Sequence, residues 1–129
     1  MENISWDPKW EIGNELIDSQ HKTLVKLIND LYFSCNKKEF DVATALSFLM
    51  EYAVTHFNDE EALQLSCGFP GYKQHKKMHK ELKATVSKLV ARYLKSGSSS
   101  DLKSSLSKVL ATWLIEHIKH EDKKIADYI

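Results

Sequence analysis

The sequence has few of the residues that interrupt helices. Its 129 residues include only four glycines and two prolines, too few for strands joined by many tight turns. Hydrophobic residues make up 43% of the chain, which is enough to fill one core at this length and excludes general disorder. We therefore expect a single domain of helical composition.

An excess of charge is also absent. Lys and Arg together number 18, as do Asp and Glu, so the formal net charge is zero. A nucleic-acid-binding domain needs a basic excess to displace counterions from phosphates. The charge balance therefore excludes nucleic acid as the expected partner.

Long apolar runs are missing as well. The most apolar stretch, residues 109–118, is interrupted by Thr112, Glu116 and His117, so we expect no membrane-spanning segment. The first residues, Met1–Asp7, lack the basic and apolar regions of a secretory signal. Both observations favour a cytoplasmic protein.

Four segments carry apolar residues at alternating spacings of three and four, the period of an amphipathic helix. We expect helices at about residues 15–33, 41–66, 72–94 and 101–119, the last extending towards the C-terminus. Helices of this length with short polar breaks predict an all-α fold, an antiparallel up-down-up-down four-helix bundle. Residues 1–14, which include two tryptophans, are expected to form an aromatic arm packed across it.

This topology bears on the two cysteines, Cys35 and Cys67. Each lies just past the end of a predicted helix, and successive helices of an antiparallel bundle end at opposite poles. The separation would far exceed the roughly 7 Å that a disulfide tolerates between Cα atoms. We therefore expect two free thiols in a reducing compartment.

Histidines interrupt the apolar stripes near the start of the first and third helices and near the end of the second and fourth. In an antiparallel bundle these four ends meet at the same pole. The residues are His21, His75, His79, His56 with Glu60, and His117. A lone core histidine usually has a satisfied hydrogen bond. Five left unpaired would cost about 1–3 kcal/mol each, too much for a domain of this size, and metal binding removes that cost.

The spacing of these residues suits chelation. His56 and Glu60 are four residues apart, as are His75 and His79, which places each pair on one helix face one turn apart. Imidazole and carboxylate ligands without a thiolate suit iron, manganese, zinc or copper. Five histidines with carboxylates exceed the ligands of one tetrahedral zinc ion, so the pattern predicts two metal ions bridged by carboxylates.

Five segments around these positions form a specific pattern when taken together, although each alone is weak. They are Trp6-Asp7-Pro8, IDSQHKTL at 17–24, HFNDEE at 56–61, YKQHKKMH at 72–79 and WLIEHIKHED at 113–122. Together they resemble the hemerythrin family, in particular its single-domain bacterial members, the bacteriohemerythrins. The resemblance covers nearly the whole chain.

The resemblance implies two non-haem iron ions joined by an oxo or hydroxo bridge, with O₂ as ligand. Three histidines would fill one iron, two would hold the other and leave a position open, and two carboxylates would bridge the pair. In that order the implied ligands are His75, His79 and His117; His21 and His56; and Glu60 and Asp122.

The match also implies an apolar oxygen pocket. Its lining would be Leu24, Phe57, Trp113 and Leu114. The alternative for each of these side chains is ordinary core packing, and the two roles are compatible because a dry lining controls access to a metal.

Helical spacing and the resemblance disagree about the last ligand. From His117, an ideal helix places Glu121 about 40° and Asp122 about 140° around the axis, so spacing favours Glu121. The resemblance assigns Asp122, and we follow it. The last helix should then be distorted between His117 and Asp122, for example by a π-bulge. His120 has no counterpart in the motif and is expected at the surface.

The function implied by the resemblance is reversible O₂ binding for storage, delivery or scavenging by a monomer that is not an enzyme. The histidine-rich ligand set favours holding O₂, whereas carboxylate-rich di-iron bundles activate it. Two alternatives stay open. One is a di-iron oxidase, peroxidase or nitric-oxide-handling enzyme, and the other is an oxygen or redox sensor that reports to a protein partner.

Overall fold

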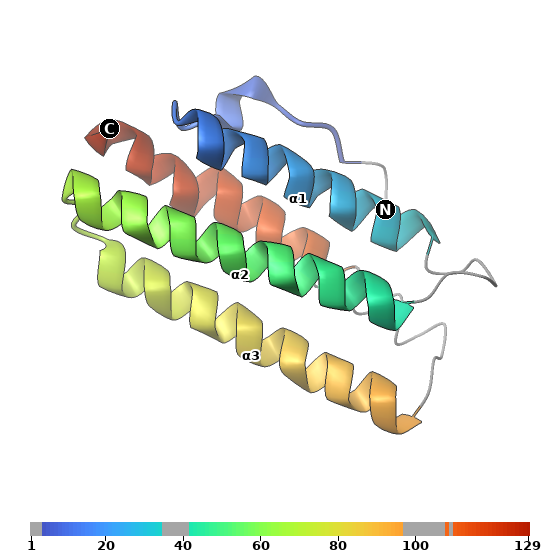
Figure 1. The fold of residues 1–129 in the computed structure, drawn as a ribbon. Helices are drawn as coiled ribbons and strands as arrows, with labels where there is room; N and C mark the ends of the chain where they lie inside the picture. Colours follow the sequence, from blue (N-terminus) through green and yellow to red (C-terminus); the bar gives the residue numbers. More distant parts are fainter. Residues whose placement is uncertain (1–3, 35–41, 97–107, 109) are drawn as a thin grey trace.

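The computed structural model describes residues 4–34, 42–96, 108 and 110–129. This part of the chain contains helices and no strand. The long helices lie side by side and alternate in direction, as the colours from blue to red show (Figure 1). The all-α four-helix bundle predicted from the sequence is therefore confirmed.

Three of the helices are regular, and the fourth changes its winding. The regular ones are α1 (Glu15–Ser34), α2 (Val42–Cys67) and α3 (Tyr72–Ser96). Their bounds lie within two residues of the predicted ones. The C-terminal helix is α-helical at residues 110–116 and continues as a π-helical turn and a 3-10 helix, η2 (His117–Glu121) and η3 (Asp122–Tyr128). Its predicted start near residue 101 lies outside the described residues.

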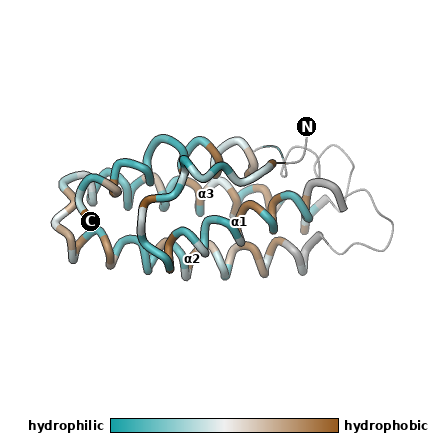
Figure 2. Tube along the Cα trace, turned by 90° about the horizontal axis from the view of Figure 1, so that it is seen from above, coloured by the Kyte–Doolittle hydropathy of each residue, from teal (hydrophilic) through white to brown (hydrophobic). Residues whose placement is uncertain are grey.

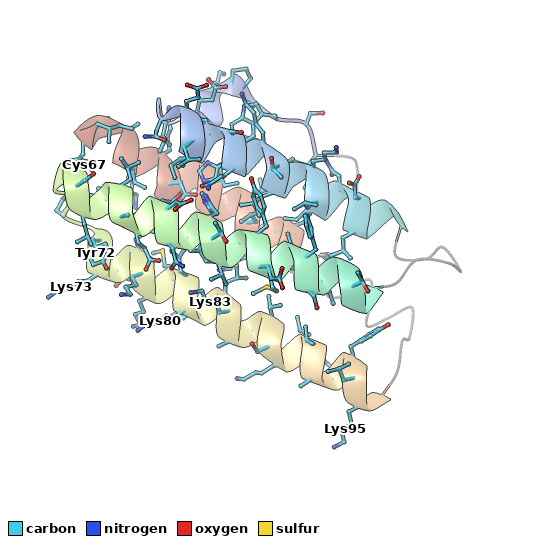
Figure 3. The ribbon with its side chains drawn as sticks, viewed as in Figure 1. Cys67, Tyr72, Lys73, Lys80, Lys83 and Lys95 are labelled. Atoms are coloured by element: carbon cyan, nitrogen blue, oxygen red, sulfur yellow. The ribbon has the colours of Figure 1, made fainter. Side chains whose placement is uncertain are left out.

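Apolar side chains from every helix meet inside the bundle. Along each helix, hydrophobic residues alternate with hydrophilic ones (Figure 2), so one face can be buried while the other meets solvent. The main cluster includes Leu24, Ile28, Phe57, Leu82 and Leu114, each at most 4% exposed. On the outer side of α3, Lys73, Lys80 and Lys95 point away from the bundle (Figure 3). No helix in the described segments is both long and apolar enough to cross a membrane.

The N-terminal arm packs on the bundle as expected. A short 3-10 turn, η1 (Pro8–Trp10), follows residue 7, and Trp6 meets Trp10 edge to face with ring centroids 5.4 Å apart. Asn29 of α1 holds the arm through its side-chain amide, which accepts from the Ile4 N–H at 2.9 Å and donates to the Ile4 carbonyl at 2.7 Å. Ile4 and both tryptophans pack against the main cluster.

Local hydrogen bonds fix where α2 ends. Gly68 adopts a left-handed conformation with φ +69°, which favours glycine because it has no Cβ. The Phe69 N–H donates to the Gln64 carbonyl at 2.9 Å, and the Gly68 N–H to the Leu65 carbonyl at 3.4 Å. This is a Schellman motif, and it turns the chain into α3. Cys67, the last residue of α2, is a free, half-buried thiol. Cys35 lies outside the described residues, so the predicted separation of the two thiols stays a prediction.

At the start of α1, a buried carboxylate joins the helix to the arm. Asp18, only 9% exposed, accepts hydrogen bonds from the Ile12 N–H at 2.8 Å and the Gly13 N–H at 3.1 Å. Asn14 caps the helix by accepting the Ile17 N–H at 3.0 Å. The Asn14 contact satisfies a backbone donor that the helix itself leaves free, and the Asp18 contacts satisfy two donors of the arm.

We expect Asp18→Ala to lower the free energy of unfolding by roughly 2–4 kcal/mol, because the buried Ile12 N–H and the part-buried Gly13 N–H lose a charged acceptor. Urea unfolding followed by circular dichroism measures the change. The matched control is Asp30→Ala, which removes an exposed carboxylate from the same helix and should shift stability by less than about 0.5 kcal/mol. Equal effects of the two substitutions would contradict the assigned role.

Candidate metal centre

Five imidazoles and two carboxylates meet in the core, and every helix contributes to them. None of the seven side chains is more than 5% exposed. In chain order they are His21 of α1, His56 and Glu60 of α2, His75 and His79 of α3, and His117 and Asp122 of the C-terminal helix. The structure thus brings together all the ligands expected from the sequence.

The ligand atoms fall into two groups, within each of which they all lie within 4.8 Å of one another. The larger group consists of Glu60, His75, His79, His117 and Asp122. The smaller consists of His21, His56, Glu60 and Asp122. Both carboxylates belong to both groups, which is the partition that the resemblance implied.

Distances in the larger group match those between neighbouring ligands of one metal ion. The Nε2 atom of His117 lies 3.0 Å from Nε2 of His75 and 3.2 Å from Nε2 of His79. Two ligands about 2.1 Å from a metal and at right angles to each other are about 3.0 Å apart. Three imidazole nitrogens at this spacing, facing one another, form a donor set for a cation.

Each carboxylate offers one oxygen to each group. Oε1 of Glu60 lies 2.8 Å from His75 Nε2, whereas its Oε2 lies 3.2 Å from both His21 Nε2 and His56 Nε2. Oδ1 of Asp122 lies 2.9 Å from His75 Nε2, whereas its Oδ2 lies 2.9 Å from His21 Nε2. This is the arrangement of a carboxylate that bridges two ions.

The electrostatics of the centre show how strongly these groups interact. Burial raises the pKa of Glu60, but hydrogen bonds from four surrounding histidines outweigh it and hold that pKa well below its usual range. Burial and the charge of Glu60 raise the pKa of Asp122, but the charge and hydrogen bond of His117 and a hydrogen bond from His21 lower it more. Both carboxylates are therefore ionised and available as ligands.

The pKa values of the histidines shift in both directions from the usual value. Burial disfavours the charged form of His21, yet hydrogen bonds to Asp122 and Glu60 raise its pKa to about 10, and the same balance raises the pKa of His75 to about 9. Burial lowers the pKa of His79, and Glu60 offsets this only in part. Without a metal, protons on His21 and His75 therefore balance the charge of the two carboxylates.

A π-helical turn places Asp122, rather than Glu121, among the clustered histidines. The Asp122 N–H donates to the His117 carbonyl five residues earlier, so this turn contains one more residue than an α-helical turn. The extra residue brings Asp122, 1% exposed, onto the face of His117. Glu121 is partly exposed and pairs with Lys124 at 3.2 Å. The predicted distortion between His117 and Asp122 is confirmed.

The expected pocket residues all belong to the main apolar cluster or pack against it. Leu24, Phe57 and Leu114 are buried and Trp113 is half-buried. Two of them lie flat on ligand rings. Phe57 stacks on His79 with centroids 3.8 Å apart, and Trp113 stacks on His117 at 4.4 Å. Their role as an oxygen pocket stays a prediction.

His120 lies at the surface, outside the group of clustered histidines, as predicted from the sequence. Its side chain is 63% exposed and pairs with Glu116 at 3.0 Å. Trp113 and His117 line a depression of about 300 Å³ that also includes His120, so one ligand ring lies close to the surface.

Three polar residues near the centre were not predicted from the sequence. Gln20 and Asp59 form a hydrogen-bonded chain to His56. Gln64 is fully buried, and its amide nitrogen and oxygen have no hydrogen-bond partner within the described segments. Helical spacing could have identified Gln64, because it follows Glu60 by four residues and so shares its helix face. No such spacing identifies Gln20, because it is adjacent to His21 in the sequence and not one turn away.

Comparison with known proteins agrees with this geometry. The model of the hemerythrin HHE cation binding domain matches residues 12–129. A bacteriohemerythrin of Pseudomonas aeruginosa is 30% identical over 130 residues, which cover 100% of this chain and 83% of that protein. A myohemerythrin of Riftia pachyptila is 31% identical over 119 residues, covering 92% of this chain and 88% of the relative.

A solved structure shares the fold. The crystal structure of a wild-type hemerythrin superposes with a TM-score of 0.86 at 22% sequence identity, covering 98% of each chain. Crystal structures of two hemerythrin variants, titled L114Y and L114A in the numbering of that protein, superpose equally well, with TM-scores of 0.87 and 0.86. The family match spans the bundle and all seven clustered side chains, and this chain is a member of the hemerythrin family.

Proposed function

We propose that the chain holds two iron ions at this centre and binds O₂ reversibly there, for storage, delivery or scavenging. One observation carries the proposal. Five imidazoles and two shared carboxylates converge in the core as two ligand groups of unequal size. Imidazole nitrogen and carboxylate oxygen suit iron, and membership of the hemerythrin family supports the choice of that metal.

Because the two ligand groups differ in size, the two proposed metal positions differ in their number of protein ligands. The larger group offers five ligand atoms and the smaller offers four. The position held by His21 and His56 therefore has fewer protein ligands, and it is where a small molecule has room to bind. When bound, a pair of ferrous ions supplies the electrons that O₂ binding requires.

The protein controls what else reaches that position. Leu24, Phe57 and Leu114, which we assign to the pocket, are at most 4% exposed within the main apolar cluster, and an apolar lining disfavours water and ions. Flat stacking of Phe57 on His79 and of Trp113 on His117 holds two ligand rings in place. A dry site with fixed ligands favours holding a small neutral molecule over releasing a reaction product.

The direct test adds O₂ to the anaerobic, ferrous protein and follows its visible absorption. We expect a charge-transfer band that appears with O₂ and disappears on deoxygenation over repeated cycles. His56→Ala should abolish the band because it removes a ligand of the smaller group. His120→Ala, which removes the exposed histidine, is the matched control and should keep it.

Two results would overturn the proposal. Immediate, irreversible oxidation with turnover of a co-substrate would identify an enzyme. Failure to bind any metal after iron reconstitution would exclude both carriage and catalysis. A sensor would also bind O₂ reversibly, but its affinity for a protein partner would differ between the O₂-bound and O₂-free forms.

Substitutions at the π-helical turn test the bridging ligand. Asp122→Asn should reduce the iron content from two ions per chain to one or none, because the amide carries no charge and offers only one oxygen. Glu121→Gln should leave the iron content unchanged, since Glu121 faces solvent and pairs with Lys124. Elemental analysis of the purified variants measures both. The reverse pattern would show that Glu121 is the ligand.

Protons and metal ions compete for the same imidazole lone pairs. In the metal-free protein the pKa values of His21 and His75 are raised to about 10 and about 9, against about 6.5 in an unfolded chain. The folded state therefore keeps protons that the unfolded state releases. This stabilisation is fully present below about pH 6.5 and is lost as the pH rises through 9 to 10.

We therefore expect the free energy of unfolding of the metal-free protein to fall between about pH 6.5 and pH 10. The iron-loaded protein should not show this fall, because metal ligands are already unprotonated. Urea unfolding with and without a chelator at each pH gives both profiles. A flat profile for the metal-free protein over this range would contradict the assigned proton positions.

A further inference from the structure

A short polar chain connects His56 to the edge of the bundle. The Nδ1 atom of His56 lies 2.7 Å from Oε1 of Gln20, and the Gln20 Nε2 donates to Oδ2 of Asp59 at 2.7 Å. Gln20 belongs to α1, whereas His56 and Asp59 belong to α2. His56 and Gln20 are 1% and 7% exposed, and Asp59 is half-buried.

The order of donors and acceptors along this chain follows from chemistry. An ionised carboxylate only accepts hydrogen bonds, so Gln20 must turn its NH₂ group towards Asp59. The Gln20 carbonyl oxygen then faces His56, and because that oxygen can only accept, His56 Nδ1 must carry a proton. The lone pair of the neutral ring is left on Nε2, the atom 3.2 Å from Oε2 of Glu60.

His56 differs from two of the other histidines because its Nδ1 atom has a hydrogen-bond partner. Nδ1 of His21 and Nδ1 of His79 have no hydrogen-bond partner within the described segments, although His79 Nδ1 lies 3.7 Å from a carboxylate oxygen of Glu61. The smaller ligand group contains only two histidines, His21 and His56. Of these two, His56 is the one whose outer nitrogen is held by a specific acceptor.

We propose that Asp59 and Gln20 are positioning residues for His56, which set its tautomer and ring orientation and strengthen it as a ligand of the two-histidine position. Hydrogen bonding at Nδ1 raises the basicity of the ring at Nε2. The half-buried charge of Asp59 acts through the amide of Gln20, which it locks in one of its two orientations. The inference rests on the proposed function only for the nature of the metal.

Asp59→Asn is the informative substitution. Asparagine keeps the size and can still hydrogen-bond to Gln20, so a purely structural link between α1 and α2 survives. Asparagine can also donate, which frees the Gln20 amide to turn over and present its NH₂ group to His56. The matched control is Asp30→Asn, on an exposed aspartate of α1.

The metal-binding readout is an Fe²⁺ titration under anaerobic conditions, with urea unfolding of the metal-free protein alongside. We expect Asp59→Asn to weaken the second of the two binding steps by about 10- to 100-fold and to leave the first unchanged. Its free energy of unfolding should match that of the control. Unchanged affinities, or equal weakening of both steps together with lost stability, would overturn the proposal.

A second readout needs no metal. The ¹⁵N chemical shifts of the His56 ring in the metal-free protein, at a pH where the ring is neutral, distinguish the two tautomers. We expect protonation at Nδ1 in the wild type and a mixture of tautomers in Asp59→Asn. Protonation at Nε2 in the wild type would by itself overturn the proposed hydrogen-bonded chain from Asp59 through Gln20 to His56. Absence of iron binding with the expected tautomers would instead refute only the proposed function.

Discussion

Burial of seven ionisable side chains at one level of the core is the constraint on which this structure depends. An isolated charge in such a place is strongly unfavourable, and here each carboxylate lies within 3.4 Å of several imidazole nitrogens. The arrangement requires one or two ligands from every helix, so it ties the four elements together at one pole.

The backbone of the last helix is shaped by the same constraint. A regular helix would present Glu121 to the centre, one turn after His117, in the way that α2 presents Glu60 after His56. The π-helical turn at His117–Glu121 moves the contact to Asp122, whose shorter side chain gives one oxygen to each ligand group. A wider turn is less favourable than an α-helical one, and the contacts of Asp122 with His21, His75 and His117 compensate for it.

The residues that could be predicted from sequence were those that repeat with the helix. Spacings of three and four predicted the bounds of α1, α2 and α3 to within two residues and brought five histidines and Glu60 to one pole. Asp122 could not be found in that way, because its place depends on a local change of winding, and only the longer motif identified it. Gln20 is next to His21 in sequence, and its role depends on Asp59 across the α1–α2 interface. No pattern within one helix encodes such a contact.

The protein holds the histidines of the two ligand groups by different means. Two rings of the three-histidine group lie flat against aromatic side chains, with Phe57 on His79 and Trp113 on His117. Stacking fixes the plane of a ring but not the position of its proton. In the two-histidine group, His56 instead donates a hydrogen bond to Gln20, which fixes the proton as well and adds electron density at Nε2. A position with fewer ligands depends more on each of them, and the polar support lies where the ligand set is smaller.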